Sequence, residues 1–162
     1  MGAGGSVTGI FHAVVVVSAM DEGIRFFRDL LGMRVTFDEM HDPASLEKLL
    51  QLPAPRVRSV IVECPDGSEI ELAQFLDAES RPVTRLFDQP GINLLSLRVT
   101  AIEALVERLT AGGYTFTSDV VSQPLPDGAV AKVVVCRGPD GIAITLTELP
   151  EGRRTLGEPE RN

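Results

Sequence analysis

The sequence predicts an α+β fold in which two βαβββ modules form a curved eight-strand sheet around a concave cleft. Strand-like runs of β-branched residues alternate with segments whose apolar residues recur at helical spacing. A Pro-Asp-Gly turn occurs twice, at residues 65–67 and 139–141, each time between two strand-like segments. Because a module of this size can hardly bury its sheet alone, we expect the two to share a core. The predicted modules span residues 8–76 and 92–150, with a linker at 77–91 and a polar tail at 151–162.

The first module contains the predicted order of elements with one additional helix. Asp21 is a candidate N-cap for a helix whose apolar stripe is Ile24, Phe27 and Leu31, and Gly32 ends that helix. Asp42 followed by Pro43 predicts a second, short helix. The four predicted strands are Ile10–Val17, Met33–Glu39, Arg56–Cys64 and Ser68–Phe75.

The second module repeats the pattern without the short helix. Thr100 and Glu103 form a candidate capping box for a helix that ends at Gly112-Gly113. We expect residues 118–128 to be a polar loop. The four predicted strands are Ile92–Val99, Tyr114–Thr117, Val130–Arg137 and Ile142–Glu148.

Composition excludes several classes of function. Fifteen Lys and Arg residues against 23 Asp and Glu give a net charge of −8, which disfavours nucleic-acid binding. No apolar run approaches the roughly 20 residues that cross a bilayer, and the Gly-rich N-terminus lacks the pattern of a signal peptide. Two cysteines make no disulfide framework, so a reducing cytoplasm is expected. No glycine-rich phosphate-binding loop follows a strand, so a nucleotide cofactor is not expected.

The order of these motifs, twice over, resembles the vicinal oxygen chelate superfamily, which includes glyoxalase I, bleomycin-resistance proteins and extradiol dioxygenases. The resemblance covers about residues 8–150 and implies a small-molecule ligand and a homodimer. It is specific for the fold and weakly specific for the reaction. The segments that carry it are the strand from His12 to Val17, Phe26-Phe27-x-x-Leu30-Leu31-Gly32, Pro65-Asp66-Gly67-x-x-Ile70-Glu71-Leu72, Leu95 to Val99, and Pro139-Asp140-Gly141-x-x-Ile144-x-Leu146.

The resemblance also implies a set of four metal ligands, of which this sequence retains half. In metal-using members, the first and last strands of each module supply one ligand each. The matching positions are His12 and Glu71 in the first module but Leu94 and Thr145 in the second. Leucine cannot bind a metal, and a threonine hydroxyl is a poor ligand. We therefore expect no tightly bound cofactor, although His12 and Glu71 are the metal ligands if a divalent ion binds.

His12 and Glu71 are the candidate catalytic residues. A histidine beside a carboxylate in a half-dry pocket can transfer a proton next to a carbonyl group without a metal. Strand alternation places His12 on the face of Val14 and Val16. The candidate substrate-binding residues of the second module are Leu94, Ser96, Arg98 and Thr145.

Three functional hypotheses follow. The first is an isomerase or lyase-like enzyme that uses His12 and Glu71. The second is a metal-free protein that binds a drug or metabolite, and in that case the His–Glu pair has no chemical role. The third is a divalent-metal enzyme of the glyoxalase or epimerase type, in which substrate or loop oxygens complete the ligand shell.

Overall fold

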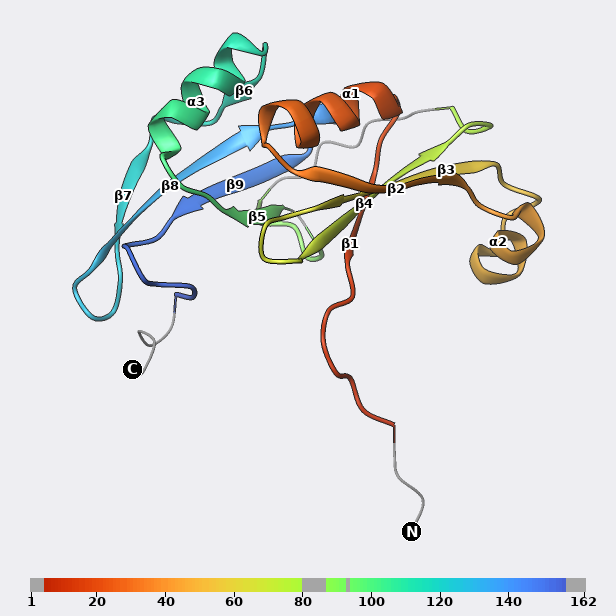
Figure 1. Ribbon diagram of the computed structural model, residues 1–162, viewed down its shortest axis with the longest axis horizontal. Helices are drawn as coiled ribbons and strands as arrows, with labels where there is room; N and C mark the ends of the chain where they lie inside the picture. The colour runs from red at the N-terminus through yellow and green to blue at the C-terminus, as the bar shows by residue number, and fades with distance from the viewer. Residues whose placement is uncertain (1–4, 80–86, 93, 157–162) are drawn as a thin grey trace. The chain divides into compact units, whose positions relative to one another are not determined.

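The computed structural model describes residues 5–79, 87–92 and 94–156, and the chain divides into two compact units, Met1–Ser80 and Arg81–Asn162 (Figure 1). Three of the predicted segments extend beyond the described residues. Residues 80–86 of the predicted linker (77–91), residue 93 of the predicted strand Ile92–Val99 and residues 157–162 of the predicted tail (151–162) lie outside the described residues.

The first unit is a four-stranded mixed sheet. Its strand order is β1-β4-β3-β2, with β1 parallel to β4 and the other neighbours antiparallel. Helix α1 continues directly into a π-helix at Arg25–Leu30, and Figure 1 shows α1 over one face of the sheet. The elements are β1 (Ala13–Val16), α1 (Met20–Ile24), β2 (Arg34–Met40), α2 (Pro43–Leu50), β3 (Val57–Glu63) and β4 (Glu69–Phe75).

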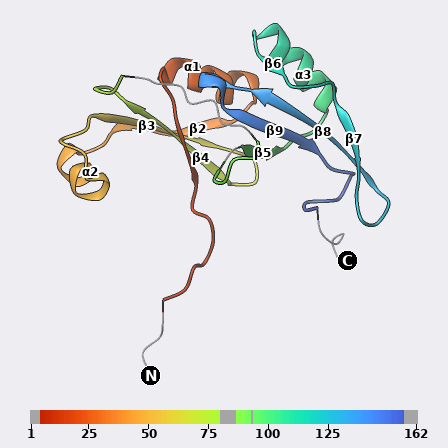
Figure 2. The same ribbon diagram turned by 180° about the vertical axis from the view of Figure 1, so that it is seen from behind.

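The second unit is a five-stranded sheet with the same plan. Its order is β5-β9-β8-β6, and β7 pairs with β8 beside β6 (Figure 2). The predicted loop at residues 118–128 is therefore wrong in part, because four of its residues form β7. The elements are β5 (Leu95–Arg98), α3 (Ile102–Ala111), β6 (Thr115–Phe116), β7 (Val121–Pro124), β8 (Val130–Arg137) and β9 (Ala143–Glu148).

Both units contain β-α-β-β-β in chain order when β6 and β7 count as one interrupted strand. In each unit the first strand runs parallel to the last, as β1 does to β4 and β5 to β9. The predicted α+β fold of two βαβββ modules is confirmed. Within the described residues, no helix has both the length and the apolar character needed to cross a bilayer.

The core of the first unit lies between its sheet and its first helical segment. Val17 and Leu72 are almost fully buried, and both side chains lie close to Gly23 of α1. Phe26 and Phe27 of the π-helix are completely buried, with their rings edge to face at 5.0 Å between centroids. The sheet therefore turns the face that carries Val17 and Leu72 toward the helix.

Two of the three predicted helix caps are wrong. Helix α1 begins at Met20, so Asp21 lies within the first turn instead of at the N-cap. In α3 the carboxylate of Glu148, on β9, accepts hydrogen bonds from the backbone N–H groups of Ala101 (2.7 Å) and Ile102 (3.3 Å), and it replaces the predicted Thr100–Glu103 box. Tertiary structure supplies this acceptor, and no local motif could have indicated it.

The third predicted cap is confirmed. The Asp42 carboxylate accepts hydrogen bonds from the backbone N–H of Ser45 (3.0 Å) and from its hydroxyl (2.8 Å). These hydrogen bonds, the hydroxyl one above all, lower the pKa of Asp42. Helix α2 is thus fixed to the end of β2 by its first residues.

Burial determines the reactivity of the two cysteines. Cys136 is completely buried in β8, and desolvation raises the pKa of its thiol to about 11. The thiolate is the reactive form, so at about pH 8 roughly one Cys136 in a thousand is ionised. We expect iodoacetamide to alkylate the partly buried Cys64 of the native protein and to leave Cys136 unmodified, as peptide mass spectrometry can check. Equal labelling of both cysteines before denaturant is added would contradict this arrangement.

Candidate functional site

The candidate site lies on the open face of the first unit. The register across the sheet places Val14, Glu71, Ile61 and Phe37 in one row, so their side chains share a face. Val14 and Val16 are more than half exposed, and Phe37 is 43% exposed. The predicted alternation is therefore confirmed, because Val15 and Val17 are buried on the opposite face.

His12 and Glu71 are in direct contact on this face. Nε2 of His12 lies 3.0 Å from Oε2 of Glu71, and their side chains are 20% and 15% exposed. The ring of His12 also packs against that of Phe11, with 4.5 Å between centroids. The other ring nitrogen, Nδ1, is buried and has no hydrogen-bond partner among the described residues.

The second oxygen of Glu71 has two partners that the sequence did not indicate. The Ser59 hydroxyl donates a hydrogen bond to Oε1 at 2.5 Å, and Nε2 of His41 lies 3.4 Å from the same atom. Ser59 lies in the middle of β3, and His41 follows the last residue of β2. Oε2 of Glu71 thus faces His12, and Oε1 faces Ser59 and His41.

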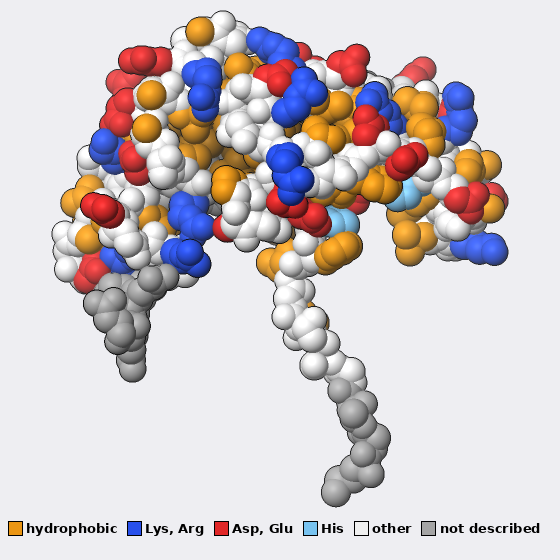
Figure 3. Space-filling view, viewed as in Figure 1, with side chains coloured by type: hydrophobic (Ala, Val, Ile, Leu, Met, Phe, Trp, Pro, Cys, Tyr) orange, Lys and Arg blue, Asp and Glu red, His pale blue; other side chains and the backbone are white. Residues whose placement is uncertain are grey.

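Polar and apolar groups meet at this site. Figure 3 shows pale-blue histidine side chains at the surface, beside orange hydrophobic ones. A carboxylate with few water contacts interacts more strongly with a neighbouring imidazole than one in open solvent. The arrangement can accept, hold and return a proton, and the exposed valines and Phe37 offer apolar contact to a ligand.

The second unit repeats this geometry with different residues. Val14 pairs with Glu71 in the first unit, and Ser96 pairs with Thr145 in the second. His12 and Leu94 lie two residues before these pairing positions, so Leu94 and Thr145 correspond to His12 and Glu71. Leu94 is 41% exposed and Thr145 is partly buried.

Arg98 is already engaged within the second unit. It pairs with Thr147, two residues beyond the Ser96–Thr145 pair and on the same face. Its Nη1 donates a hydrogen bond to the backbone carbonyl of Arg154 at 2.9 Å. The C-terminal segment therefore restrains the direction of this guanidinium.

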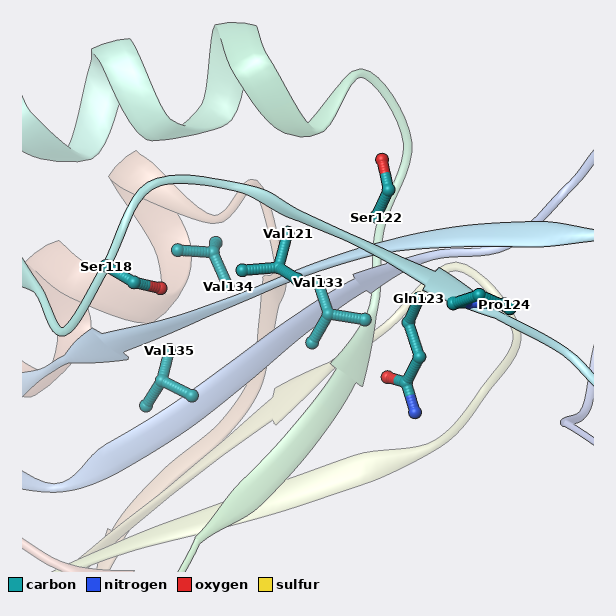
Figure 4. Close-up of a pocket in the computed structure, with 8 residues that line it drawn as sticks. All are labelled: Ser118, Val121, Ser122, Gln123, Pro124, Val133, Val134 and Val135. Atoms are coloured by element: carbon teal, nitrogen blue, oxygen red, sulfur yellow. The ribbon is translucent and has the colours of Figure 1, made fainter.

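A shallow pocket of about 290 Å³ lies elsewhere in the second unit, on β7 and β8 (Figure 4). Val133, Val135 and Gln123 point to one side of the sheet and Val134 to the other. None of the four predicted substrate-binding residues lines it. Its lining was missed because β7 was interpreted as loop; the residues are Ser118, Val121, Ser122, Gln123, Pro124, Val133, Val134 and Val135.

Residues 9–146 match the Glyoxalase/Bleomycin resistance protein/Dioxygenase superfamily. The chain belongs to this superfamily. The match spans both units, in agreement with the duplicated module. The chain matches no curated protein.

Solved structures of the superfamily share the fold. A glyoxalase family protein from Bacillus cereus is 24% identical with a TM-score of 0.81, and the alignment covers 92% of this chain and 99% of that one. A glyoxylase/bleomycin resistance protein/dioxygenase domain from Frankia sp. is 23% identical with a TM-score of 0.62, covering 90% and 100%. A variant of glyoxalase I from Zea mays is 16% identical with a TM-score of 0.61, covering 85% and 44%.

The side chains of this superfamily member do not fit the four-ligand metal site that the resemblance implies. Leu94 and Thr145 occupy the matching positions of the second unit and supply no strong ligand. In the part of the chain that the structure describes, no group of three or more His, Cys, Asp or Glu side chains is arranged to hold a metal ion. His12 and His41 contact different oxygens of Glu71 and form hydrogen-bonding contacts instead.

Proposed function

We propose that this protein is a small-molecule isomerase or lyase-like enzyme that moves a proton at the carbon next to a carbonyl group. Glu71 and His12 are its acid–base pair. The observation that carries the proposal is the 3.0 Å contact between Nε2 of His12 and Oε2 of Glu71 on a partly exposed, largely apolar face. Positioned proton transfer of this kind contributes about 10²–10⁴-fold to a rate.

The two residues have different roles in this proposal. An ionised carboxylate only accepts hydrogen bonds, so Nε2 of His12 carries the hydrogen of the contact. Nδ1 of His12 is buried, which closes that nitrogen to a ligand. Glu71 is therefore the group that takes the proton from the substrate carbon and, as the neutral acid, returns it to the product, while the Nε2–H of His12 stabilises the negative charge of the carboxylate.

The candidate ligand-binding residues of the second unit offer hydrogen-bond donors. They are the hydroxyl groups of Ser96 and Thr145 and the guanidinium of Arg98, which share one face of that unit's sheet. Leu94 supplies apolar contact in place of a polar side chain. These assignments rest on the shared face and register of the two strands.

The test is solvent deuterium exchange into a panel of small ketones, aldehydes and thioesters, followed by proton NMR. We expect the wild-type protein to exchange the hydrogen next to the carbonyl of at least one compound. His12→Ala should lower that rate about 10- to 100-fold, and added imidazole should restore part of it. A His12→Ala variant that exchanges at the wild-type rate would remove His12 from the chemistry.

A second candidate function is binding without chemistry, as in a drug- or metabolite-binding protein. The valine-lined pocket of about 290 Å³ favours it, since small apolar ligands bind in hollows of this kind. Saturable binding of the neutral aromatic dye N-phenylnaphthylamine, by a protein that exchanges no compound of the panel, would favour this candidate over the enzyme.

A further inference from the structure

Ser59 stands out because it is a buried polar residue on the same face of the sheet as Glu71. Its exposure is 1%, and within the described residues no other polar or charged side chain is as buried. It pairs with Ala73 on β4, one diagonal step from Glu71. A hydroxyl in such a place must be hydrogen-bonded, and Oε1 of Glu71 accepts that bond at 2.5 Å.

His41 reaches the same oxygen from the other edge of the sheet. Its backbone N–H donates to the carbonyl of Val57 at 2.9 Å, which fixes the main chain where β2 ends. The next residue, Asp42, caps α2, the helix that the second unit lacks. The additional helix of the first unit therefore begins two residues after His41, whose imidazole contacts Glu71.

The terminal torsion of a glutamate is broad, so an unrestrained carboxylate exchanges its two oxygens readily. With Ser59 and His41 on Oε1 and His12 on Oε2, the two oxygens become distinct. We propose that Ser59 and His41 are positioning residues that hold Glu71 by Oε1 and so leave Oε2 as the proton-transferring oxygen. This inference rests on the proposed function and names two residues that act through Glu71.

The hydrogen bonds around Glu71 can be tested by NMR without any substrate. Long-range ¹H–¹⁵N NMR of histidine-labelled protein in alkaline buffer reports which ring nitrogen of each imidazole carries the hydrogen. In the wild-type protein we expect His12 to be fixed with its hydrogen on Nε2, facing Glu71. In Ser59→Ala and in His41→Gln, the two ¹⁵N shifts of His12 should move toward each other as the carboxylate loosens.

Two variants separate positioning from a merely structural role. Ser59→Thr keeps the hydroxyl and should retain the wild-type His12 shifts. Ser45→Ala removes a hydroxyl that binds Asp42 and not Glu71, so it should leave the His12 signals unchanged. A Ser59→Ala protein that is less stable to heat but keeps the wild-type His12 shifts would overturn the inference.

Two further outcomes are decisive. On the compound that exchanges fastest, Ser59→Ala should lower kcat about tenfold with KM unchanged. Zinc titration by calorimetry should show no tight site. Tight zinc binding that is lost in His41→Gln would overturn the inference, because the three side chains would then be metal ligands. If no compound exchanges but the His12 shifts change in Ser59→Ala and His41→Gln as expected, the proposed proton-transfer function is wrong. The positioning of Glu71 by Ser59 and His41 is then still supported.

Discussion

Glu71→Gln should lower the exchange rate by about 10³-fold or more, the largest effect of any single change at the site. An amide cannot take up the proton that the carboxylate accepts. Glutamine has nearly the same shape, and its oxygen can still accept the Ser59 hydrogen bond, so the fold should persist. The measurement is the rate of deuterium exchange, with circular dichroism as the check on folding.

Glu69→Gln is the matched control for this change. Glu69 lies two residues earlier on β4, so its side chain is on the same face and is also partly buried. It pairs with Glu63 and belongs to no part of the proposed machinery. Its variant should exchange at the wild-type rate. A Glu71→Gln protein as active as Glu69→Gln would refute the assignment of the base.

The relative size of two effects tests the division of roles. If Glu71 takes the proton and His12 supports it, the loss in Glu71→Gln should exceed that in His12→Ala by at least about tenfold. The reverse order would mean that His12 takes the proton through Nε2. The buried position of Nδ1 is the reason to expect the first order.

The sequence could predict the duplicated module and the pairing of His12 with Glu71. The module follows from signals that the chain repeats, namely strand-length β-branched runs and Pro-Asp-Gly turns, whereas the pairing of His12 with Glu71 was implied by the resemblance to the superfamily. The repeated register, Val14 with Glu71 and Ser96 with Thr145, shows that the two modules place equivalent residues on their paired first and last strands.

No repeated motif in the sequence indicated that Ser59 and His41 contact Glu71. Ser59 is one polar residue within a strand, and polar residues in strands usually face solvent. His41 is 30 residues from Glu71, and no periodicity tells how the chain turns between β2 and α2. Strand β7 was missed because its sequence, Val-Ser-Gln-Pro, lacks apolar alternation and is held by pairing with β8.

The predicted apolar stripe of the first helix was incomplete for a different reason, which is the period of the helix. The stripe Ile24, Phe27 and Leu31 assumes the α-helical period, yet Phe26 is as buried as Phe27. The backbone N–H of Leu31 donates to the carbonyl of Phe26, five residues earlier, which is the π-helical pattern. The wider turn here allows two neighbouring rings to be completely buried.

Phe27→Ala should therefore destabilise the first unit by about 3–5 kcal/mol, because it removes a completely buried ring and leaves a cavity. The substitution also removes the edge-to-face contact that the Phe26 ring makes with Phe27. Hydrogen exchange of the β3 and β4 amides measures the change for this unit directly. Leu49→Ala on α2 is the control, since Leu49 is 75% exposed and its loss should change stability by no more than about 0.5 kcal/mol.

The same variant separates the two faces of the sheet. Leu72 packs beside Gly23 on the helix side, while its neighbour Glu71 faces the candidate site. If the helix side serves stability alone, turnover in Phe27→Ala should fall in proportion to the folded fraction. The deuterium-exchange rate per folded molecule should then equal that of the wild type at a temperature where both are folded. A lower rate per folded molecule would mean that packing against the π-helix also positions Glu71.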